Sequence, residues 1–376
     1  MFPDHGHRRI AVASDSDIAT ARRIAAERAG GVLGVAETAR LDELVAALGG
    51  HAMNQPGGGT LLIGRVRGGA GVECLAYDRS PATGSTPADD ALPLALSAAR
   101  GLADRFLIHA TPGIGTALLA RVLRPGASDL PPEGAVAQVG AVMVARDDGA
   151  APDDPASARI DSWFVRCDAA RGPEGPCGIA LLIDGDVGNE DNSGIDGGDA
   201  EGILPPSAVT PAVIRQVEAV VAATVPGLPA PMVVNAIRRD LLGRPELGLA
   251  PDREVAGLGR SAIAVLRFDG AAVDYTALGT VAGAVVRRQE ILSLGARWAM
   301  VGFNPLAPAA VHLLWGPGDH VVLYSGGCSR LPALFINRGL RDLDPTLAAL
   351  VLLRDGVVRD DDHTILVLRN RSNPAA

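Results

Sequence analysis

Residues 179–202 read IALLIDGDVGNEDNSGIDGGDAEG, and this stretch decides how the second half of the chain folds. Its first five residues are an apolar run, which indicates a buried strand, and the Asp-Gly that follows places a carboxylate at a sheet edge. Carboxylate oxygens on a flexible backbone suit a hard cation such as Mg²⁺, Mn²⁺ or Ca²⁺. A solvated acidic loop is the alternative that this segment alone leaves open. The acidic residues behind the first aspartate are Asp186, Glu190, Asp191, Asp196, Asp199 and Glu201.

The composition is that of a globular protein without a basic surface. Of the 376 residues, 48% are hydrophobic and 20% are charged, and the formal net charge is -9. Such a chain lacks the positive field that attracts phosphates, so we expect no nucleic-acid partner. All 34 basic residues are arginine, which excludes mechanisms that need a catalytic lysine, including a Walker-type phosphate loop.

Cysteine usage and hydropathy predict a cytoplasmic protein. The cysteines show no C-x-x-C spacing, so we expect reduced thiols rather than a structural zinc site. The first ten residues, MFPDHGHRRI, lack the apolar core of a signal peptide. No apolar window reaches the length of a membrane span, so we expect no membrane partner. The four cysteines are Cys74, Cys167, Cys177 and Cys328.

A proline- and glycine-rich segment divides the chain into two predicted domains. Residues 125–133, PGASDLPPE, form the linker between domain 1–124 and domain 134–370, and 371–376 form a tail. The first domain is predicted as an α/β sandwich with helices on one face of a mixed sheet. Its expected strands are 9–13, 60–66, 71–78 and 116–122, and its expected helices are 18–26, 35–52 and 92–106.

The second domain is predicted as a β-sandwich flanked by helices. Short strand-like runs dominate it, and two segments carry the apolar stripe of an amphipathic helix. The expected helices are 209–221 and 230–242. The expected strands are 135–144, 162–166, 179–183, 261–268, 273–278, 282–287, 311–315, 320–324 and 363–368.

Motifs of the second domain resemble one family of enzymes across most of its length. That family is the bacterial PPM-type protein serine/threonine phosphatases of the SpoIIE-like group. The landmarks are Asp161 before an early strand, Asp184-Gly185 after an apolar strand, and residues 361–364, which match D-D-x-T. Phosphatases of this family hold two Mg²⁺ or Mn²⁺ ions on such aspartates. The resemblance therefore implies that Asp161, Asp184 and Asp361 are catalytic metal ligands and that Gly185 offers its carbonyl.

The match departs from the family pattern at the S-D-G motif. Residues 316–327 read GPGDHVVLYSGG, so Gly326 stands at the aspartate position and has no side chain to coordinate a metal. Asp186 lies beside Asp184 and could replace the missing carboxylate. The sequence leaves open a working two-metal site and an incomplete one.

The first domain resembles the GHKL-type (HATPase) ATP-binding fold of anti-sigma-factor serine kinases. The resemblance implies cofactor-binding roles for four residues, which are Glu43, Asp78, Gly115 and Thr116. However, Ala47 replaces the asparagine that holds Mg²⁺ in that family, and glycines of the phosphate-contacting segments are absent. We therefore expect this domain to bind a partner protein rather than to act as an ATP-dependent kinase. Domains of this kind often pair, so the resemblance also admits a homodimer.

Both resemblances imply a regulator of bacterial partner switching. One hypothesis is a phosphatase that dephosphorylates a phosphoserine regulatory protein, such as a phosphorylated anti-sigma-antagonist-like protein. The other hypothesis is a pseudophosphatase and pseudokinase that binds sigma-factor regulators as a scaffold. The sequence leaves both hypotheses open.

Overall fold

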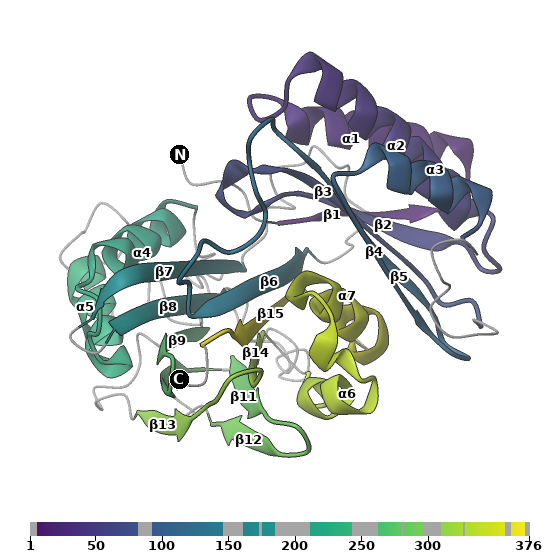
Figure 1. Ribbon diagram of the computed structural model, residues 1–376. Helices are drawn as coiled ribbons and strands as arrows, with labels where there is room; N and C mark the ends of the chain where they lie inside the picture. The colour runs from purple at the N-terminus through teal and green to yellow at the C-terminus, as the bar shows by residue number, and fades with distance from the viewer. Residues whose placement is uncertain are drawn as a thin grey trace, which may run out of the picture.

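The structure is a computed structural model of the chain and describes residues 6–81, 92–145, 161–172, 175–184, 211–242, 262–279, 281–295, 310–325, 328–357 and 362–372. These residues stack in six layers (Figure 1). Three helices cover an N-terminal sheet, whose other face lies on one helix of the second half. That helix and a neighbouring helix rest on a central sheet, which packs on a distal sheet covered by two further helices. The predicted α/β fold class, with a sheet sandwich in the second half, is confirmed.

The N-terminal half contains three helices and a five-stranded sheet. Its elements are β1 (Arg8–Val12), α1 (Asp15–Ala29), α2 (Val35–Met53), β2 (Gly59–Arg65), β3 (Gly71–Asp78), α3 (Leu94–Leu102), β4 (Arg105–Thr111) and β5 (Gly115–Leu123). The strand order is β1-β2-β3-β5-β4, and every pairing is antiparallel. This corrects the prediction of a mixed sheet. Short turns at 66–70 and 112–114 join neighbouring strands, and a tight turn returns the chain antiparallel.

Strand β4 lies where the sequence predicted the end of a helix. Helix α3 ends at Leu102, and the chain then pairs with β5 from Arg105 to Thr111. The predicted helix at 92–106 was therefore too long. The run at 105–111 is apolar enough for either structure, and pairing with β5 decides in favour of a strand.

The second half contains two antiparallel five-stranded sheets. The central sheet consists of β12 (Ile291–Leu294), β11 (Ala282–Val286), β14 (His320–Tyr324), β15 (His363–Asn370) and β6 (Ala137–Val144). The distal sheet consists of β13 (Val311–Leu314), β10 (Ala272–Leu278), β9 (Ala262–Asp269), β8 (Gly175–Asp184) and β7 (Ser162–Gly172). The two predicted helices are present as α4 (Pro211–Ala223) and α5 (Ala230–Leu242), which cover the distal sheet.

Two helices of the second half were absent from the prediction. They are α6 (Leu331–Asn337) and α7 (Pro345–Gly356), and α7 is the layer between the N-terminal and central sheets (Figure 1). Every residue of α7 except Asp355 is buried. Gly140 of β6 permits this packing, because a Cβ atom there would lie 2.0 Å from the backbone nitrogen of Thr346. The second half thus contributes the helix that covers the open face of the first.

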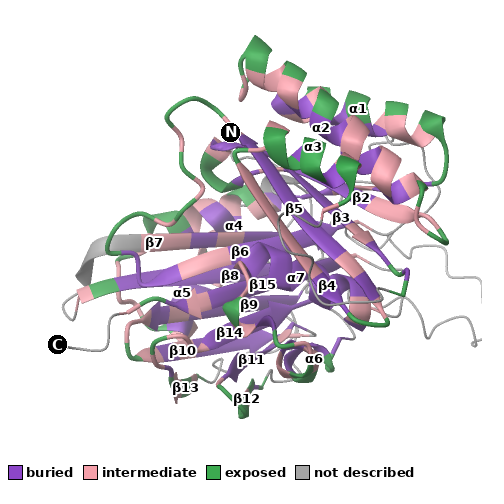
Figure 2. Ribbon diagram, turned by 45° about the vertical axis from the view of Figure 1, so that its right-hand side comes forward, coloured by how far each residue is buried: buried purple, intermediate pink, exposed green. Residues whose placement is uncertain are grey.

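Four apolar cores hold the layers together. Alternate residues of one strand enter different cores: in β5, Leu118 packs under α1–α3, whereas Leu119 packs against α7. In β8, Leu182 lies between the two sheets of the second half, and Ile183 packs against α4 and α5. Figure 2 shows the consequence, since the strands are largely buried while the outer faces of α1–α3 are exposed. Strands covered on both faces are continuous apolar runs, which is the pattern seen at 179–183.

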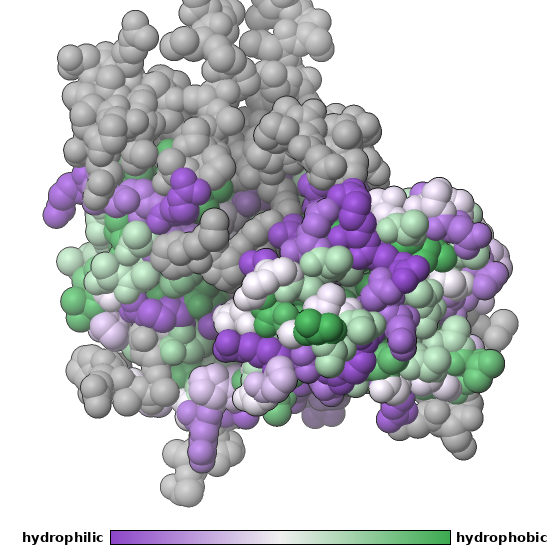
Figure 3. Space-filling model, turned by 90° about the horizontal axis from the view of Figure 1, so that it is seen from above, coloured by the Kyte–Doolittle hydropathy of each residue, from purple (hydrophilic) through white to green (hydrophobic). Residues whose placement is uncertain are grey.

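Exposed large apolar side chains are scattered over the described surface. Val35 and Leu94 are the most exposed, at 92% and 88%, and begin α2 and α3. Viewed from above, the N-terminal half shows hydrophilic and hydrophobic residues interspersed (Figure 3). No described helix combines the length and apolar character needed to cross a bilayer.

Candidate active site

Asp161 lies immediately before β7, between the distal and central sheets. Ser162 pairs with Ile183, so the antiparallel ladder brings the start of β7 to the end of β8, where Asp184 lies. Two hydroxyls of the central sheet donate to Asp161 Oδ2: Ser325 Oγ at 2.8 Å and Thr364 Oγ1 at 2.9 Å. The Thr364 amide also donates to Ser325 Oγ at 2.9 Å. One carboxylate oxygen of Asp161, at the start of a distal-sheet strand, is thus held by two hydroxyls of the central sheet.

The other carboxylate oxygen of Asp161 differs from the first. Asp161 Oδ1 is buried and has no hydrogen-bond partner among the described residues. Burial raises the pKa of Asp161 well above its usual range, and the carboxylates of Asp184 and Asp362 raise it further, against the two hydroxyl bonds. An unsatisfied buried oxygen surrounded by like charges is costly unless a cation or a proton compensates it.

These residues fit a hard divalent cation, as far as they are described. Carboxylate oxygens are the ligands that Mg²⁺ and Mn²⁺ prefer, and Asp161 and Asp184 are 3% and 6% exposed. The described residues alone do not form a cluster of three or more Asp, Glu, His or Cys side chains able to hold a metal. Some positions of the predicted metal site lie outside the described residues. They are the predicted ligands Gly185, Asp186 and Asp361, and Gly326, where the phosphatase pattern has aspartate.

Sequence reasoning missed the residues that surround Asp161. Ser325 and Thr364 belong to the motifs that located the site. No pattern in the sequence indicates that their hydroxyls donate hydrogen bonds to Asp161. Asp362 follows the predicted ligand Asp361, and its charge acts on Asp161. Glu218 of α4 is also buried, on the α4-covered face of the distal sheet, and accepts a 3.1 Å bond from Ser162 Oγ, the residue after Asp161. Burial raises the pKa of Glu218, against the Ser162 bond and the charge of Arg215.

The N-terminal half brings three of its four predicted cofactor residues together. Asp78 ends β3, and its Oδ1 accepts bonds from the amides of Ser80 at 2.9 Å and Thr116 at 3.4 Å. Gly115 allows this approach: its φ is 151°, and a Cβ there would lie 2.1 Å from the Asp78 carbonyl oxygen. Asp78 is therefore a buried carboxylate that ties β3 to the start of β5.

The fourth predicted residue, Glu43, lies apart on α2. Its side chain is exposed. His51 is half-buried two turns further along α2, a rise of about 12 Å. Burial lowers the pKa of His51, and the nearby charge of Asp78 opposes that shift. The described structure thus places His51, rather than Glu43, near the Asp78 carboxylate.

A buried set of charges, here called the seam cluster, joins the two halves. Arg121 of β5 pairs with Glu73 at 2.8 Å and with Asp129 at 2.7 Å, and donates to Thr346 Oγ1 at 2.9 Å. His7 contacts Glu73 at 3.0 Å while its backbone bridges to β6. The seam cluster comprises His7, Glu73, Arg105, Arg121, Asp129, Asp344 and Thr346.

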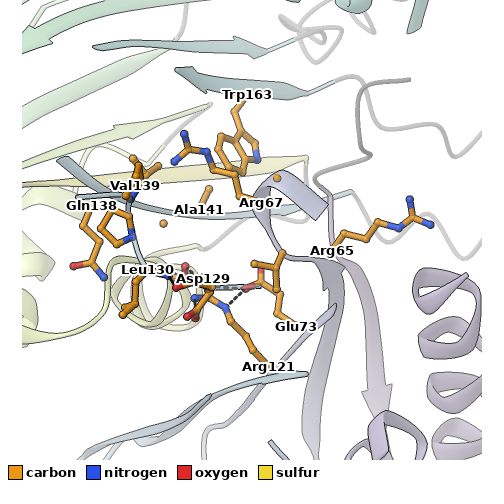
Figure 4. Close-up of a pocket in the computed structure, with 17 residues that line it drawn as sticks. Arg65, Arg67, Glu73, Arg121, Asp129, Leu130, Gln138, Val139, Ala141 and Trp163 are labelled. Carbon is orange, nitrogen blue, oxygen red and sulfur yellow. Dashed lines mark hydrogen bonds and ion pairs between the residues drawn. The ribbon is translucent and has the colours of Figure 1, made fainter. Parts of the chain in front are cut away.

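A cavity of about 270 Å³ lies beside the seam cluster. Figure 4 shows Glu73 and Asp129 on either side of Arg121, with Arg67 and Trp163 across the cavity and Arg65 directed away. The arginines have protein partners: Arg67 donates to the Val165 carbonyl at 3.0 Å, and Arg65 donates to the Arg28 carbonyl at 3.0 Å. These internal pairings explain the polar lining without a ligand.

Comparison with known proteins gives likenesses at the level of structure alone. Neither a family model nor a curated protein matches the sequence. The phosphatase domain of SpoIIE from Bacillus subtilis, with a fragment of its regulatory domain, is 15% identical, with a TM-score of 0.42 and 83% of each chain covered. The RsbU and RsbW domains of a Mycobacterium tuberculosis protein are 16% identical, with a TM-score of 0.44, covering 65% of this chain and 64% of that one.

A third solved structure is the catalytic domain of the serine/threonine phosphatase PstP in complex with two manganese ions. It is 15% identical, with a TM-score of 0.41, covering 62% of this chain and 98% of that one. With TM-scores below 0.5, these likenesses carry no inference about activity. Function is inferred below from the residues of the site.

Proposed function

We propose that the chain is a metal-dependent phosphatase that removes phosphate from a phosphoserine regulatory protein. The observation that carries this proposal is Asp161 Oδ1, a buried oxygen without a hydrogen-bond partner among the described residues, beside the charges of Asp184 and Asp362. Such an arrangement favours a divalent cation. Its position between two sheets, with both hydroxyl donors on the opposite oxygen, leaves that oxygen free to coordinate.

The proposed metal ligands are Asp161, Asp184, the Gly185 carbonyl and Asp361, with Asp186 in place of the carboxylate that Gly326 lacks. Mg²⁺ or Mn²⁺ held by these residues would supply an activated water and would stabilise negative charge on the transferred phosphoryl group. The chain's own contribution is orientation. Ser325 and Thr364 hold Asp161 Oδ2, which directs Oδ1 away from the hydroxyls.

The proposed substrate is a phosphorylated anti-sigma-antagonist-like protein of a bacterial partner-switching pathway. This assignment rests on the sequence resemblance of both halves to components of such pathways. In the N-terminal half, Asp78 Oδ1 already accepts from Ser80 and Thr116. We therefore assign this half a protein-binding role, without ATP turnover.

A second candidate function is a catalytically impaired scaffold for sigma-factor regulators. The observation that favours it is Gly326, which removes one carboxylate from the family pattern. The two functions differ in turnover. The phosphatase function is supported if the wild type hydrolyses a phosphoserine peptide in Mn²⁺ and Asp184→Ala does not. The scaffold function is supported if the wild type does not hydrolyse the peptide and Gly326→Asp does.

A further inference from the structure

The last turn of α7 is fixed to strand β4 by a buried arginine. The Arg354 side chain is 0% exposed, and its Nη2 donates to Thr111 Oγ1 at 2.7 Å. Its Nε donates to Asp355 at 2.7 Å, and Asp355 also pairs with Arg338 at 2.7 Å. Thr111, in the N-terminal half, thus accepts a hydrogen bond from the buried guanidinium of Arg354, in the second half.

A second bond from the N-terminal half reaches the same turn. Arg79 Nη2 donates to the backbone carbonyl of Arg354 at 2.9 Å. Arg79 directly follows Asp78, and Thr111 pairs with Gly115 in the β4–β5 ladder. Asp78 and Thr111 therefore lie at the same end of the N-terminal sheet, and this end binds the last turn of α7 through the Arg354 side chain and the Arg354 main-chain carbonyl.

The end of α7 is close in sequence to residues of the candidate metal site. Helix α7 ends at Gly356, and Asp362, six residues further along the chain, directly precedes β15. Thr364 of that strand donates to Asp161 Oδ2, and Asp362 acts on the charge of Asp161. The turn that β4 fixes is thus close in sequence to two residues that shape the site.

We propose that Thr111 and Arg354 are positioning residues for the metal site, through which the N-terminal half sets the start of β15. The inference rests on the proposed function for its catalytic meaning. The opposite end of α7 is held independently, because Arg105 pairs with Asp344 at 2.8 Å and Arg121 donates to Thr346. Loss of the Thr111 hydroxyl therefore loosens one turn while the helix stays docked.

The test compares two substitutions at Thr111 in the full chain. Thr111→Val keeps the shape and removes the hydroxyl, whereas Thr111→Ser keeps the hydroxyl. Thr38→Val is the matched control, since the Thr38 hydroxyl bonds to the Gly34 carbonyl at the start of α2. Two quantities are measured: amide hydrogen exchange of residues 363–366, and Mn²⁺ affinity by calorimetry.

We expect Thr111→Val to speed exchange at 363–366 and to weaken Mn²⁺ binding roughly ten-fold, as loss of outer-shell support does at metal sites. Thr111→Ser and Thr38→Val should match the wild type in both measurements. If Thr111→Val exchanges these amides at the wild-type rate, the inference is wrong. It is also wrong if the wild type binds Mn²⁺ and Thr111→Val binds it with the same affinity. If the wild type binds no Mn²⁺, the proposed function is refuted. The hydrogen-exchange rates of Thr111→Val and the wild type then test the positioning role without the affinity measurement.

Discussion

Glu73 and Arg121 form a buried ion pair, 2.8 Å apart, where the N-terminal sheet meets α7. Glu73 lies on β3 and Arg121 on the neighbouring β5, opposite each other in the ladder. Arg121 extends the pair to the linker at Asp129 and to α7 at Thr346. Arg121, which is 7% exposed, therefore contacts a strand of the first half, the linker and a helix of the second half at once.

This ion pair predicts a pH-dependent loss of stability in Glu73→Gln. Burial alone would raise the pKa of Glu73, but Arg121 and His7 outweigh it, so the pKa lies below its ordinary value of 4.5. A lowered pKa contributes stability above pH 4.5 that is lost as the pH falls through the folded-state value. At pH 7 we expect Glu73→Gln to lose about 3 kcal/mol in urea unfolding. The gap to wild type should narrow in acid, and a gap independent of pH would contradict this.

The hydroxyls on Asp161 predict a second effect, on metal affinity. Ser325→Ala and Thr364→Val each remove one donor to Asp161 Oδ2. We expect Mn²⁺ affinity, measured by calorimetry, to fall about 10- to 100-fold in each variant. Ser372→Ala is the control, because its hydroxyl bonds to the Gly270 carbonyl beyond the end of β15. Equal affinity in all four proteins would rule out a role of these hydroxyls.

Asp161→Asn should stabilise the metal-free protein. Burial and the charges of Asp184 and Asp362 raise the pKa of Asp161, so between its ordinary and its folded-state pKa the native state retains a proton that the unfolded chain releases. Stability of the wild type therefore falls as the pH rises from the ordinary pKa to the folded-state value. At neutral pH we expect the variant to gain about 1 kcal/mol in the absence of metal and to lose the stabilisation that Mn²⁺ gives the wild type. A metal-free variant less stable than wild type would count against the like-charge account.

Gly140→Ala tests the docking of α7. The added Cβ would lie 2.0 Å from the Thr346 nitrogen and 2.3 Å from the Pro345 carbonyl carbon, so β6 and α7 must separate. Overpacking against backbone should cost about 3 kcal/mol in urea unfolding. Gly101→Ala in α3 is the matched control, because a Cβ there meets nothing within 4 Å. If both variants unfold at the same urea concentration, α7 is not packed as described.

Many strands, and the positions of Asp161 and Asp184 at strand ends, were predictable from the sequence, whereas the packing between the halves was not. The run before Asp184 predicted β8 because both faces of that strand are buried. The same circumstance hid α7: a helix buried on all sides has no polar face and so no 3.6-residue periodicity. The support of Asp161 by Ser325 and Thr364 was also hidden, because those residues are 164 and 203 positions away.

The proposed function is tested most directly by hydrolysis of a phosphoserine peptide in Mn²⁺, with wild type and Asp184→Ala compared at equal concentration. We predict turnover by the wild type, its loss on chelation of the metal, and its loss in Asp184→Ala. Gly326→Asp is measured alongside, because it introduces the carboxylate that the SpoIIE-like phosphatase pattern has at this position. A wild type without turnover, or turnover that survives in Asp184→Ala, would contradict the phosphatase assignment.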